Sequence, residues 1–204
     1  MIKRRGTLFV VSAPSGAGKT TLCREMRLRL NDLAYSVSVT TRAPRPGEID
    51  GSDFRFVSEA QFREMQGRNE MAEWATVHGN LYGTPAAPLE AALRAGRDVL
   101  LDIDTQGAAQ LRGRYADAVL VFIVAPSMAE LEQRLRERRS DPEAEIARRL
   151  GRAREEMMLW RQYDYLIVNR DVKDAMEQLE SIIQAERCRV GRLALNFPDL
   201  EVPN

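Results

Sequence analysis

A glycine-rich segment near the start of the chain has the residues needed to hold a phosphate chain. Residues 13–20 read Ala-Pro-Ser-Gly-Ala-Gly-Lys-Thr, between a short apolar run and a segment with a helical pattern. The glycines let backbone N–H groups turn inward around phosphate oxygens, and the start of the helix adds partial positive charge. Lys19 can reach the β- and γ-phosphates of a nucleotide, and the Thr20 hydroxyl can bind Mg²⁺. The segment therefore predicts a nucleotide-binding P-loop.

One position departs from the usual P-loop pattern, because Ala13 stands where a glycine is common. Alanine strongly prefers negative φ, so we expect an extended or turn-like backbone there. A glycine-rich turn with a lysine nearby by chance is the alternative, and the preceding strand together with the Lys-Thr pair argues against it. The predicted nucleotide-binding loop consists of Ala13, Pro14, Ser15, Gly16, Ala17, Gly18, Lys19 and Thr20.

An acidic residue at the end of a second apolar run is a candidate metal ligand. Residues 99–102 read Val-Leu-Leu-Asp, which is typical of a buried strand that ends in a carboxylate. Beside a P-loop, Asp102 can hold the water shell of Mg²⁺ while Thr20 binds the ion through its hydroxyl. Because acids often end strands for other reasons, this inference depends on the P-loop. Asp104, two residues on, is a second candidate.

Two arginines lie close together in a stiff loop farther along the chain. Arg42 and Arg45 belong to residues 41–48, which also contain two prolines and a glycine. Two guanidinium groups on a loop with little freedom make a good clamp for a second phosphate group. The alternative is a basic loop that is merely solvated. A P-loop alone serves GTPases, ATPases and kinases, so this segment is the one that discriminates among them.

The elements that must position these residues alternate between apolar strands and helices. Buried strands are predicted at residues 7–12, 99–103, 119–124 and 165–168, with helical segments between them. Such alternation is typical of an α/β fold with a parallel sheet. Residues 36–88 interrupt the alternation with short β-rich runs and a hairpin signal around Gly79-Asn80, which predicts an inserted lobe rich in antiparallel strands.

Local signals predict where several helices begin. Ser58, followed by Gln61 three residues later, is a capping-box pattern. Thr84 is expected to cap another helix, with Pro85 in its first turn. Further helices are expected over residues 20–30, 141–162 and 172–186, whereas residues 195–204 are expected to be loose.

Composition excludes several classes of protein. Among 204 residues, Lys plus Arg and Asp plus Glu each number 30, and this balance argues against a general nucleic-acid or acidic-membrane binder. Cys23 and Cys188 lie far apart and show no metal-ligand spacing, which favours ordinary thiols in a reducing compartment. No apolar run approaches the roughly 18 residues that span a bilayer. We therefore expect a cytoplasmic chain with no membrane or nucleic-acid partner; the oligomeric state, including a homo-oligomer, stays open.

The segment of residues 40–57 resembles the signature of guanylate kinases, which are P-loop nucleoside-monophosphate kinases of the bacterial type. The resemblance extends over residues 6–187 and includes Glu73-Trp74-Ala75, the run Gly-Asn-Leu-Tyr-Gly-Thr that ends at Thr84, and residues 101–107 and 163–169. It implies a P-loop kinase fold with a parallel core sheet. The implied parts are a core of 6–35, 89–125 and 164–187, a β-rich GMP-binding lobe of 36–88, a helical lid of 126–163 and a C-terminal tail of 188–204.

The resemblance implies transfer of the γ-phosphoryl group of ATP to GMP, and also to dGMP, with Mg²⁺ as cofactor. Such an activity is essential for recycling GMP and for guanine nucleotide supply. The implied catalytic residues are Lys19, Arg42, Arg138 and Arg149. ATP is implied to contact the P-loop together with Arg134, Arg138 and Asn169. GMP is implied to contact Ser38, Arg42, Arg45, Phe54, Glu73, Tyr82, Thr84 and Asp104.

Elementary chemistry agrees with the implied role of Glu73. Guanine presents an N1–H group and an N2 amino group on one edge, and a carboxylate can accept hydrogen bonds from both. Adenine has an unprotonated N1 and no such paired donor edge, so it would leave the carboxylate poorly paired. A polar site of this kind discriminates strongly between substrates.

Two positions depart from the family pattern. Phe54 stands where a tyrosine is usual, and the missing hydroxyl is one that the family directs at the GMP phosphate. A hydrogen bond to a charged group contributes roughly 1.5–3 kcal/mol, so we expect weaker GMP binding than a Phe54→Tyr variant would have. Arg170 stands where an acid is common, so the adenine edge is expected to differ.

Three other functions fit parts of the sequence. A ribose 1,5-bisphosphate phosphokinase resembles guanylate kinases around the P-loop, but Arg42, Arg45 and Glu73 argue against it. A catalytically inactive guanylate-kinase-like binding module would not need Lys19 or the arginine-rich lid. A regulatory GTPase would need an Asn-Lys-x-Asp-like element, and the sequence contains none.

Overall fold

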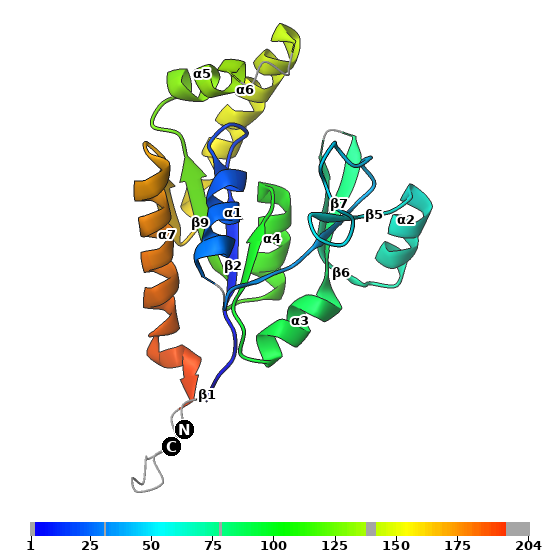
Figure 1. Ribbon diagram of the computed structural model, residues 1–204, viewed down its shortest axis with the longest axis vertical. Coiled ribbons are helices and arrows are strands. Elements are labelled where there is room, and N and C mark those ends of the chain that lie inside the picture. The colour runs from blue at the N-terminus through cyan, green and yellow to red at the C-terminus, as the bar shows by residue number, and fades with distance from the viewer. Residues whose placement is uncertain (1–2, 31, 78, 138–141, 195–204) are drawn as a thin grey trace, which may run out of the picture.

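The computed structural model describes residues 3–30, 32–77, 79–137 and 142–194. Its core is a five-stranded sheet in which all neighbouring strands are parallel, in the order β10-β9-β2-β8-β3 (Figure 1). These strands are β2 (Leu8–Ser12), β3 (Ala34–Tyr35), β8 (Val99–Asp102), β9 (Val119–Val124) and β10 (Tyr165–Val168). The predicted α/β fold with a parallel core sheet is therefore confirmed.

Helices cover both faces of the core sheet, and two more stand above its upper end (Figure 1). Those that contribute side chains to the core clusters are α1 (Lys19–Arg29), α3 (Ala86–Arg94), α4 (Thr105–Arg114), α5 (Met128–Glu137), α6 (Glu143–Met157) and α7 (Val172–Arg187).

The central strand β2 packs against helices on both sides. Phe9 and Val11 belong to a cluster that includes side chains of α1 and α7, whereas Leu8 and Val10 belong to a second cluster with side chains of α3 and α4. Successive side chains of a strand point to opposite faces, so a strand covered on both faces has no polar side. This double burial explains why β2 reads as a continuous apolar run.

A second sheet forms a lobe beside the core (Figure 1). Its order is β5-β4-β7-β6, and β7 pairs antiparallel with both β4 and β6. The prediction of a β-rich lobe is confirmed, but β4 and β5 are parallel, because the long loop of residues 41–53 returns the chain to the same end of the sheet. The strands are β4 (Ser38–Thr40), β5 (Phe54–Phe56), β6 (Met71–Val77) and β7 (Asn80–Pro85).

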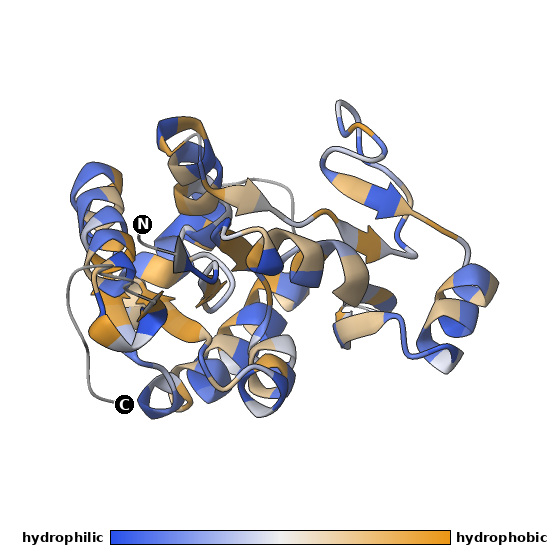
Figure 2. Cartoon of the chain, turned by 90° about the horizontal axis from the view of Figure 1, so that it is seen from below, coloured by the Kyte–Doolittle hydropathy of each residue, from blue (hydrophilic) through white to orange (hydrophobic). Residues whose placement is uncertain are grey.

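Helix α2 (Glu59–Gly67) covers the lobe and begins as its sequence predicts. The Ser58 side chain accepts from the Gln61 N–H, and the Gln61 side chain accepts from the Ser58 N–H, which completes the capping box. The buried Phe62 anchors the helix against Val39 and Leu81 of the lobe sheet. In Figure 2 the strands of the lobe carry orange, hydrophobic residues among blue ones.

The predicted cap at Thr84 is wrong. Thr84 belongs to β7, and α3 begins at Ala86 with Pro85 as N-cap and without a side-chain capping bond. The Thr84 hydroxyl instead donates to the buried Glu73 carboxylate, 2.6 Å away. A buried carboxylate without a partner is costly, so this tertiary contact outweighs the local capping preference.

The long helix predicted to reach residue 162 is shorter. Helix α6 ends at Met157, and a separate 3₁₀ turn, Trp160–Gln162, follows it. Residues 138–141, which include the predicted lid residue Arg138, lie outside the described residues.

The N-terminal end of the core sheet is held together by one buried carboxylate. The Asp98 side chain accepts hydrogen bonds from Arg4, from the Thr7 N–H and from Arg187, at 2.6–2.8 Å. Burial alone would raise the pKa of Asp98, but these three donors outweigh it and hold the pKa below its usual range. The contacts tie the first strand, the strand β8 and the last helix to one another.

Part of the predicted C-terminal tail has regular structure. A 3₁₀ turn, Val190–Arg192, leads into β11 (Leu193–Ala194), which pairs antiparallel with β1 (Lys3–Arg4). The expectation for residues 195–204 falls outside the described residues. No helix in the described part of the chain is long and apolar enough to cross a membrane.

Candidate active site

The predicted phosphate-binding residues lie at the carboxyl end of the core sheet. Strand β2 runs directly into the P-loop, and its parallel register with β8 pairs Val11 with Asp102. The carboxyl ends of parallel strands meet at one edge, where α/β proteins bind their ligands. The two candidate motifs of the sequence, the loop before α1 and the acid that ends β8, are therefore neighbours.

Left-handed backbone at two glycines shapes the P-loop. Gly16 has φ 93° and Gly18 has φ 96°, values that residues with a Cβ rarely adopt. Gly18 is also the N-cap of α1, and a Cβ there would lie 2.3 Å from the Nδ2 atom of Asn169. Ala13 has no positive φ, as its sequence predicts.

Asn169 holds the P-loop through a side-chain hydrogen bond. Its side chain is buried, and its Nδ2 donates to the Ala17 carbonyl oxygen at 2.7 Å. Its backbone oxygen accepts from Arg134 at 2.9 Å, which links the end of β10 to helix α5. Asn169 Oδ1 has no hydrogen-bond partner within the described chain. The predicted contact of this residue with adenine stays a prediction.

Lys19 and Asp102 lie together at the mouth of the loop. Lys19 Nζ donates to the Ile103 carbonyl oxygen at 2.9 Å and is 3.7 Å from the Asp102 carboxylate. Thr20 follows on the exposed side of α1. Mg²⁺ is typically bound through one or two protein oxygens plus substrate phosphates, so the Thr20 hydroxyl and the Asp102 carboxylate fit a Mg²⁺ ion.

Two of the arginines predicted for the lid lie in the described residues, and each is paired with an acid of its own helix. Arg134 contacts Glu130 at 2.8 Å, and Arg149 contacts Glu145 at 3.1 Å. Both arginines are only partly exposed. In Figure 1, α5 and α6 stand above the end of the sheet from which the P-loop leads into α1.

Arg42 is fixed in the lobe by polar and aromatic contacts. Its Nη2 donates to both carboxylate oxygens of Glu48, at 2.8 and 3.0 Å, and its Nε donates to the Tyr82 hydroxyl at 3.2 Å. The guanidinium lies over the rings of Phe54 and Phe56, with 5.5 and 5.8 Å to the centroids. Arg42 is therefore positioned without a ligand.

Glu48 organises the whole arginine loop. Besides accepting from the Arg42 guanidinium, it accepts from the Arg45 N–H at 2.7 Å. Hydrogen bonding from Arg42 lowers the pKa of Glu48, so this carboxylate stays ionised. The Arg45 side chain itself is exposed.

A buried polar group lies between the lobe and the core. Glu73 of β6 is opposite Thr84 of β7 in the strand register and is only 4% exposed. Burial raises the pKa of Glu73 to about 7; the hydrogen bond from Thr84 opposes this rise, and the charge of Asp104 adds to it. Asp104 is the N-cap of α4 and accepts from the Gly107 N–H at 2.9 Å. Both protonation states of Glu73 are therefore accessible near neutral pH.

The family comparison agrees with a P-loop that follows a strand of a parallel core sheet. The family model described as guanylate kinase matches residues 5–186. The chain belongs to the guanylate kinase family.

Similar members of the guanylate kinase family occur in several bacteria. A guanylate kinase from Nitrobacter hamburgensis is 52% identical over 192 residues, which cover 94% of this chain and 88% of the relative. A guanylate kinase from Geobacter sulfurreducens is also 52% identical, with 94% and 95% covered. The crystal structure of guanylate kinase from Anaplasma phagocytophilum superposes with a TM-score of 0.80, at 36% identity, and the match covers 95% of this chain and 92% of that one.

The predicted site residues fall into three groups in space. The P-loop group contains Lys19 with Asp102, and the arginine group contains Arg42 with Tyr82 and Phe54. The acidic group contains Glu73, Thr84 and Asp104, while Ser38 begins β4 of the lobe sheet and is partly buried. Within the described residues the side chains of Arg42 and Arg45 do not contact each other, although both lie in the same loop.

Sequence reasoning missed two contacts that shape the acidic group. Gly107, in the first turn of α4, faces Glu73, and a Cβ on it would lie 2.3 Å from Glu73 Oε2. Arg152 of α6 lies 3.6 Å from the Asp104 carboxylate, so this helix reaches the acidic group. Sequence spacing carries no signal for either contact, because both join segments that are distant along the chain.

The close approach of Gly107 to Glu73 yields a direct test. In a Gly107→Ala variant the new methyl group displaces the buried carboxylate, because Thr84 and Ile103 leave it little room. We expect the KM for GMP to rise about tenfold, the effect of roughly one lost hydrogen bond to a charged group, while the KM for ATP changes little.

The matched control is Gly113→Ala on the same helix. A Cβ at Gly113 meets no atom within 4 Å, and alanine favours helix, so this variant should keep the parental KM values and melt no lower. Equal KM values for GMP in the two variants would contradict the assigned role of Gly107.

Proposed function

We propose that this chain transfers the γ-phosphoryl group of ATP to GMP, giving ADP and GDP, and that dGMP is a second acceptor. The observation that supports this most is the position of the acidic group beside the P-loop. Lys19 donates to the carbonyl oxygen of Ile103, which directly precedes Asp104. Asp104 accepts from the N–H of Gly107, and Gly107 faces Glu73. In this proposal residues 6–35, 89–125 and 164–187 form the core, residues 36–88 bind GMP and residues 126–163 close as a lid.

Arg42 and its neighbours are the proposed site for the GMP phosphate. The Arg42 guanidinium is held by Glu48 and by the ring of Phe54, so it loses little side-chain entropy when a phosphate binds. Arg45 is exposed on the same loop and free to turn toward the phosphate. The Tyr82 hydroxyl, which already accepts from Arg42, can donate its own proton to a phosphate oxygen.

Glu73 is the proposed reader of the guanine base. Its Oε1 accepts from Thr84, and its remaining lone pairs can accept from guanine N1–H and N2. Asp104 and Ser38 are the proposed flanking contacts to the base. Because the carboxylate is buried, a base that offers no donors would leave it unpaired, and this cost supplies the discrimination.

The P-loop and the lid are the proposed ATP site. Residues 13–20 supply backbone N–H groups and Lys19 for the phosphates. Thr20 and Asp102 are the proposed holders of Mg²⁺, which when bound would neutralise charge on the transferred group. Arg134 and Arg149, with Arg138 outside the described residues, are the proposed lid cations.

Catalysis in this proposal is alignment and charge neutralisation. The acceptor is a phosphate oxygen whose second pKa is about 6, so it is largely ionised at pH 7 and needs no general base. Arg42 orients this oxygen, and Lys19 and the lid arginines stabilise charge that develops on the transferred group. Closure of the lobe and the lid excludes water from the reaction.

The proposed location is the cytoplasm. Both cysteines are free thiols, with Cys23 buried and Cys188 exposed, which suits a reducing compartment. The proposed partners are the two nucleotides; the balanced charge gives no reason to add a nucleic acid or a membrane.

An ADP-release assay tests the proposed reaction. With ATP and Mg²⁺, we expect the highest kcat/KM for GMP, followed by dGMP, and a value for AMP lower by a factor on the order of 10⁴. UMP, dTMP and ribose 1,5-bisphosphate complete the panel, and Lys19→Ala is the inactive control. Highest activity on AMP or on the sugar phosphate excludes the proposal, and no activity on any acceptor points to a binding module.

The Phe54→Tyr variant tests how the acceptor phosphate is held. The ring stays in place over Arg42 and edge-on to Tyr82, at 6.0 Å between centroids, and the new hydroxyl can reach the phosphate. A hydrogen bond to a charged group contributes roughly 1.5–3 kcal/mol, so the KM for GMP should fall about tenfold or more. An unchanged KM in Phe54→Tyr would refute the prediction.

The pH dependence of GMP binding tests Glu73. Below its pKa of about 7 the carboxyl is protonated and accepts poorly; above it the carboxylate can accept from both guanine donors. The KM for GMP should therefore fall about tenfold between pH 6 and pH 8, as the ionised fraction rises. Glu73→Gln should bind GMP weakly and keep only the shallower pH dependence of the GMP phosphate itself. A variant that retains the full parental dependence would show that Glu73 is not the titrating group.

A further inference from the structure

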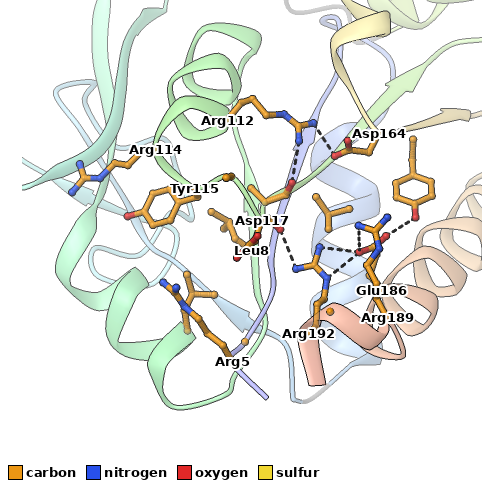
Figure 3. Close-up of a pocket in the computed structure, with 17 residues that line it drawn as sticks. Arg5, Leu8, Arg112, Arg114, Tyr115, Asp117, Asp164, Glu186, Arg189 and Arg192 are labelled. Carbon is orange, nitrogen blue, oxygen red and sulfur yellow. Dashed lines mark hydrogen bonds and ion pairs between the residues drawn. The ribbon is translucent and has the colours of Figure 1, made fainter. Parts of the chain in front are cut away.

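A cavity of about 740 Å³ lies where strands β2, β9 and β10 begin (Figure 3). Its floor includes Leu8, Val119 and Tyr165, which are the first residues of β2, β9 and β10. The P-loop follows the last residue of β2, and five residues of strand separate the two ends by roughly 13 Å. The cavity is therefore distinct from the active site.

The wall of this cavity is cationic. Its five arginines face three acids, Asp117, Asp164 and Glu186, which leaves an excess of two positive charges. The chain as a whole is neutral, so the excess is local. The arginines are Arg5, Arg112, Arg114, Arg189 and Arg192.

Two of the three acids are already neutralised by arginines of the wall. Arg112 is paired with Asp164 at 2.8 Å, and Arg192 is paired with Glu186 at 2.9 Å. Glu186 also accepts from the Tyr165 hydroxyl at 2.6 Å, so its capacity as an acceptor is largely used. Arg112 and Arg192 are therefore neutralised by acids of the wall and contribute little charge to a ligand.

The other arginines retain unused donors. Arg5 makes no hydrogen bond or ion pair with any described residue, and Arg189 is 65% exposed and only 3.6 Å from the already paired Glu186. Arg114 donates to the Met71 carbonyl oxygen and lies 3.6 Å from Glu90. Positive charge is therefore available at the cavity, most of all from Arg5 and Arg189.

The arginines approach the cavity from different sides. Figure 3 shows Arg5 and Arg114 on the side of Tyr115, and Arg189 and Arg192 on the opposite side, beside Glu186. Because the arginines stand on two sides of the cavity, an ion with several linked anionic groups can pair with more of them than a single small anion can. Guanidinium groups pair bidentately with phosphate oxygens, and the volume is in the usual range for small-molecule sites.

We propose that this cavity binds a small molecule that carries two or more linked phosphate groups. The site is separate from the proposed kinase reaction and does not depend on it. Asp117 is the one acid of the wall whose carboxylate has no hydrogen bond or ion pair within the described chain, and it lowers the positive potential. Removing the charge of Asp117 should therefore strengthen phosphate binding, whereas removing the charge of an arginine should weaken it.

Isothermal titration with inorganic triphosphate tests the site in the full-length chain. The active site is first saturated with GMP and a non-hydrolysable ATP analogue, with Mg²⁺ in excess, so that the P-loop cannot bind the probe. We expect saturable binding of one triphosphate per chain. Arg5→Gln and Arg189→Gln should each weaken it about tenfold, and Asp117→Asn should strengthen it several-fold.

Arg63→Gln is the matched control, because Arg63 is an exposed arginine of α2, in the lobe, paired with Glu59. It should leave triphosphate binding unchanged, and equal melting temperatures show that all variants are folded. A parallel titration with GTP identifies the source of the phosphates: tighter binding than triphosphate supports a nucleotide, and equal binding supports an inorganic chain.

Two results would overturn the proposal. One is the absence of saturable triphosphate binding up to about 10 mM in the chain with its active site filled. The other is binding that Arg5→Gln, Arg189→Gln and Asp117→Asn all leave unchanged, because the probe then binds elsewhere. Neither result bears on phosphoryl transfer, which the ADP-release assay measures independently.

Discussion

The parallel pairing of β2 between β8 and β9 is the constraint on which the rest of the structure depends. It sets Val11 beside Asp102 on one side and Val121 on the other. The P-loop, the acid that ends β8 and the segment that leads from β9 into α5 therefore leave the sheet at the same edge. The pairing also requires that both faces of β2 be covered, and the two hydrophobic clusters meet this requirement.

The active-site edge combines strained backbone and buried polar groups, both of which cost stability. In the P-loop, Gly16 and Gly18 adopt positive φ without steric strain because glycine has no Cβ. Asn169 fixes the loop by a hydrogen bond to the Ala17 carbonyl oxygen. Glu73 is the more costly feature, since burial raises the pKa of its carboxyl to about 7 although Thr84 donates to it. A group kept in this condition is suited to bind a ligand that brings donors of its own.

Charged side chains near the N-terminal end of the core sheet differ in how fully they are paired. At the N-terminal end Asp98 is fully satisfied by three donors and serves to join β1, β8 and α7. In the nearby cavity, Arg5 and Arg189 keep unused donors instead. A buried charge with all its partners stabilises a fold, whereas exposed arginines with few protein partners at a cavity are available to a ligand.

Local patterns in the sequence were sufficient for several features because each depends on neighbours along the chain. The apolar run of β2, the capping box of Ser58 and Gln61, and the hairpin at Gly79-Asn80 are of this kind, and the structure has all three. The P-loop is also local, since its glycines and Lys19 are consecutive. The family resemblance rested on such ordered local matches, and the family match over residues 5–186 confirms it.

Features that join distant segments were decided only by the tertiary structure. Thr84 stands where the sequence predicts a helix cap, but its hydroxyl donates to Glu73 on the neighbouring strand instead. The contacts of Gly107 with Glu73 and of Arg152 with Asp104 depend on how α4 and α6 pack, and no spacing along the chain encodes them. The sequence by itself thus determined which chemical groups are present and which local elements carry them. Packing decided which groups meet, because the cost of a buried unpaired charge exceeds any local preference.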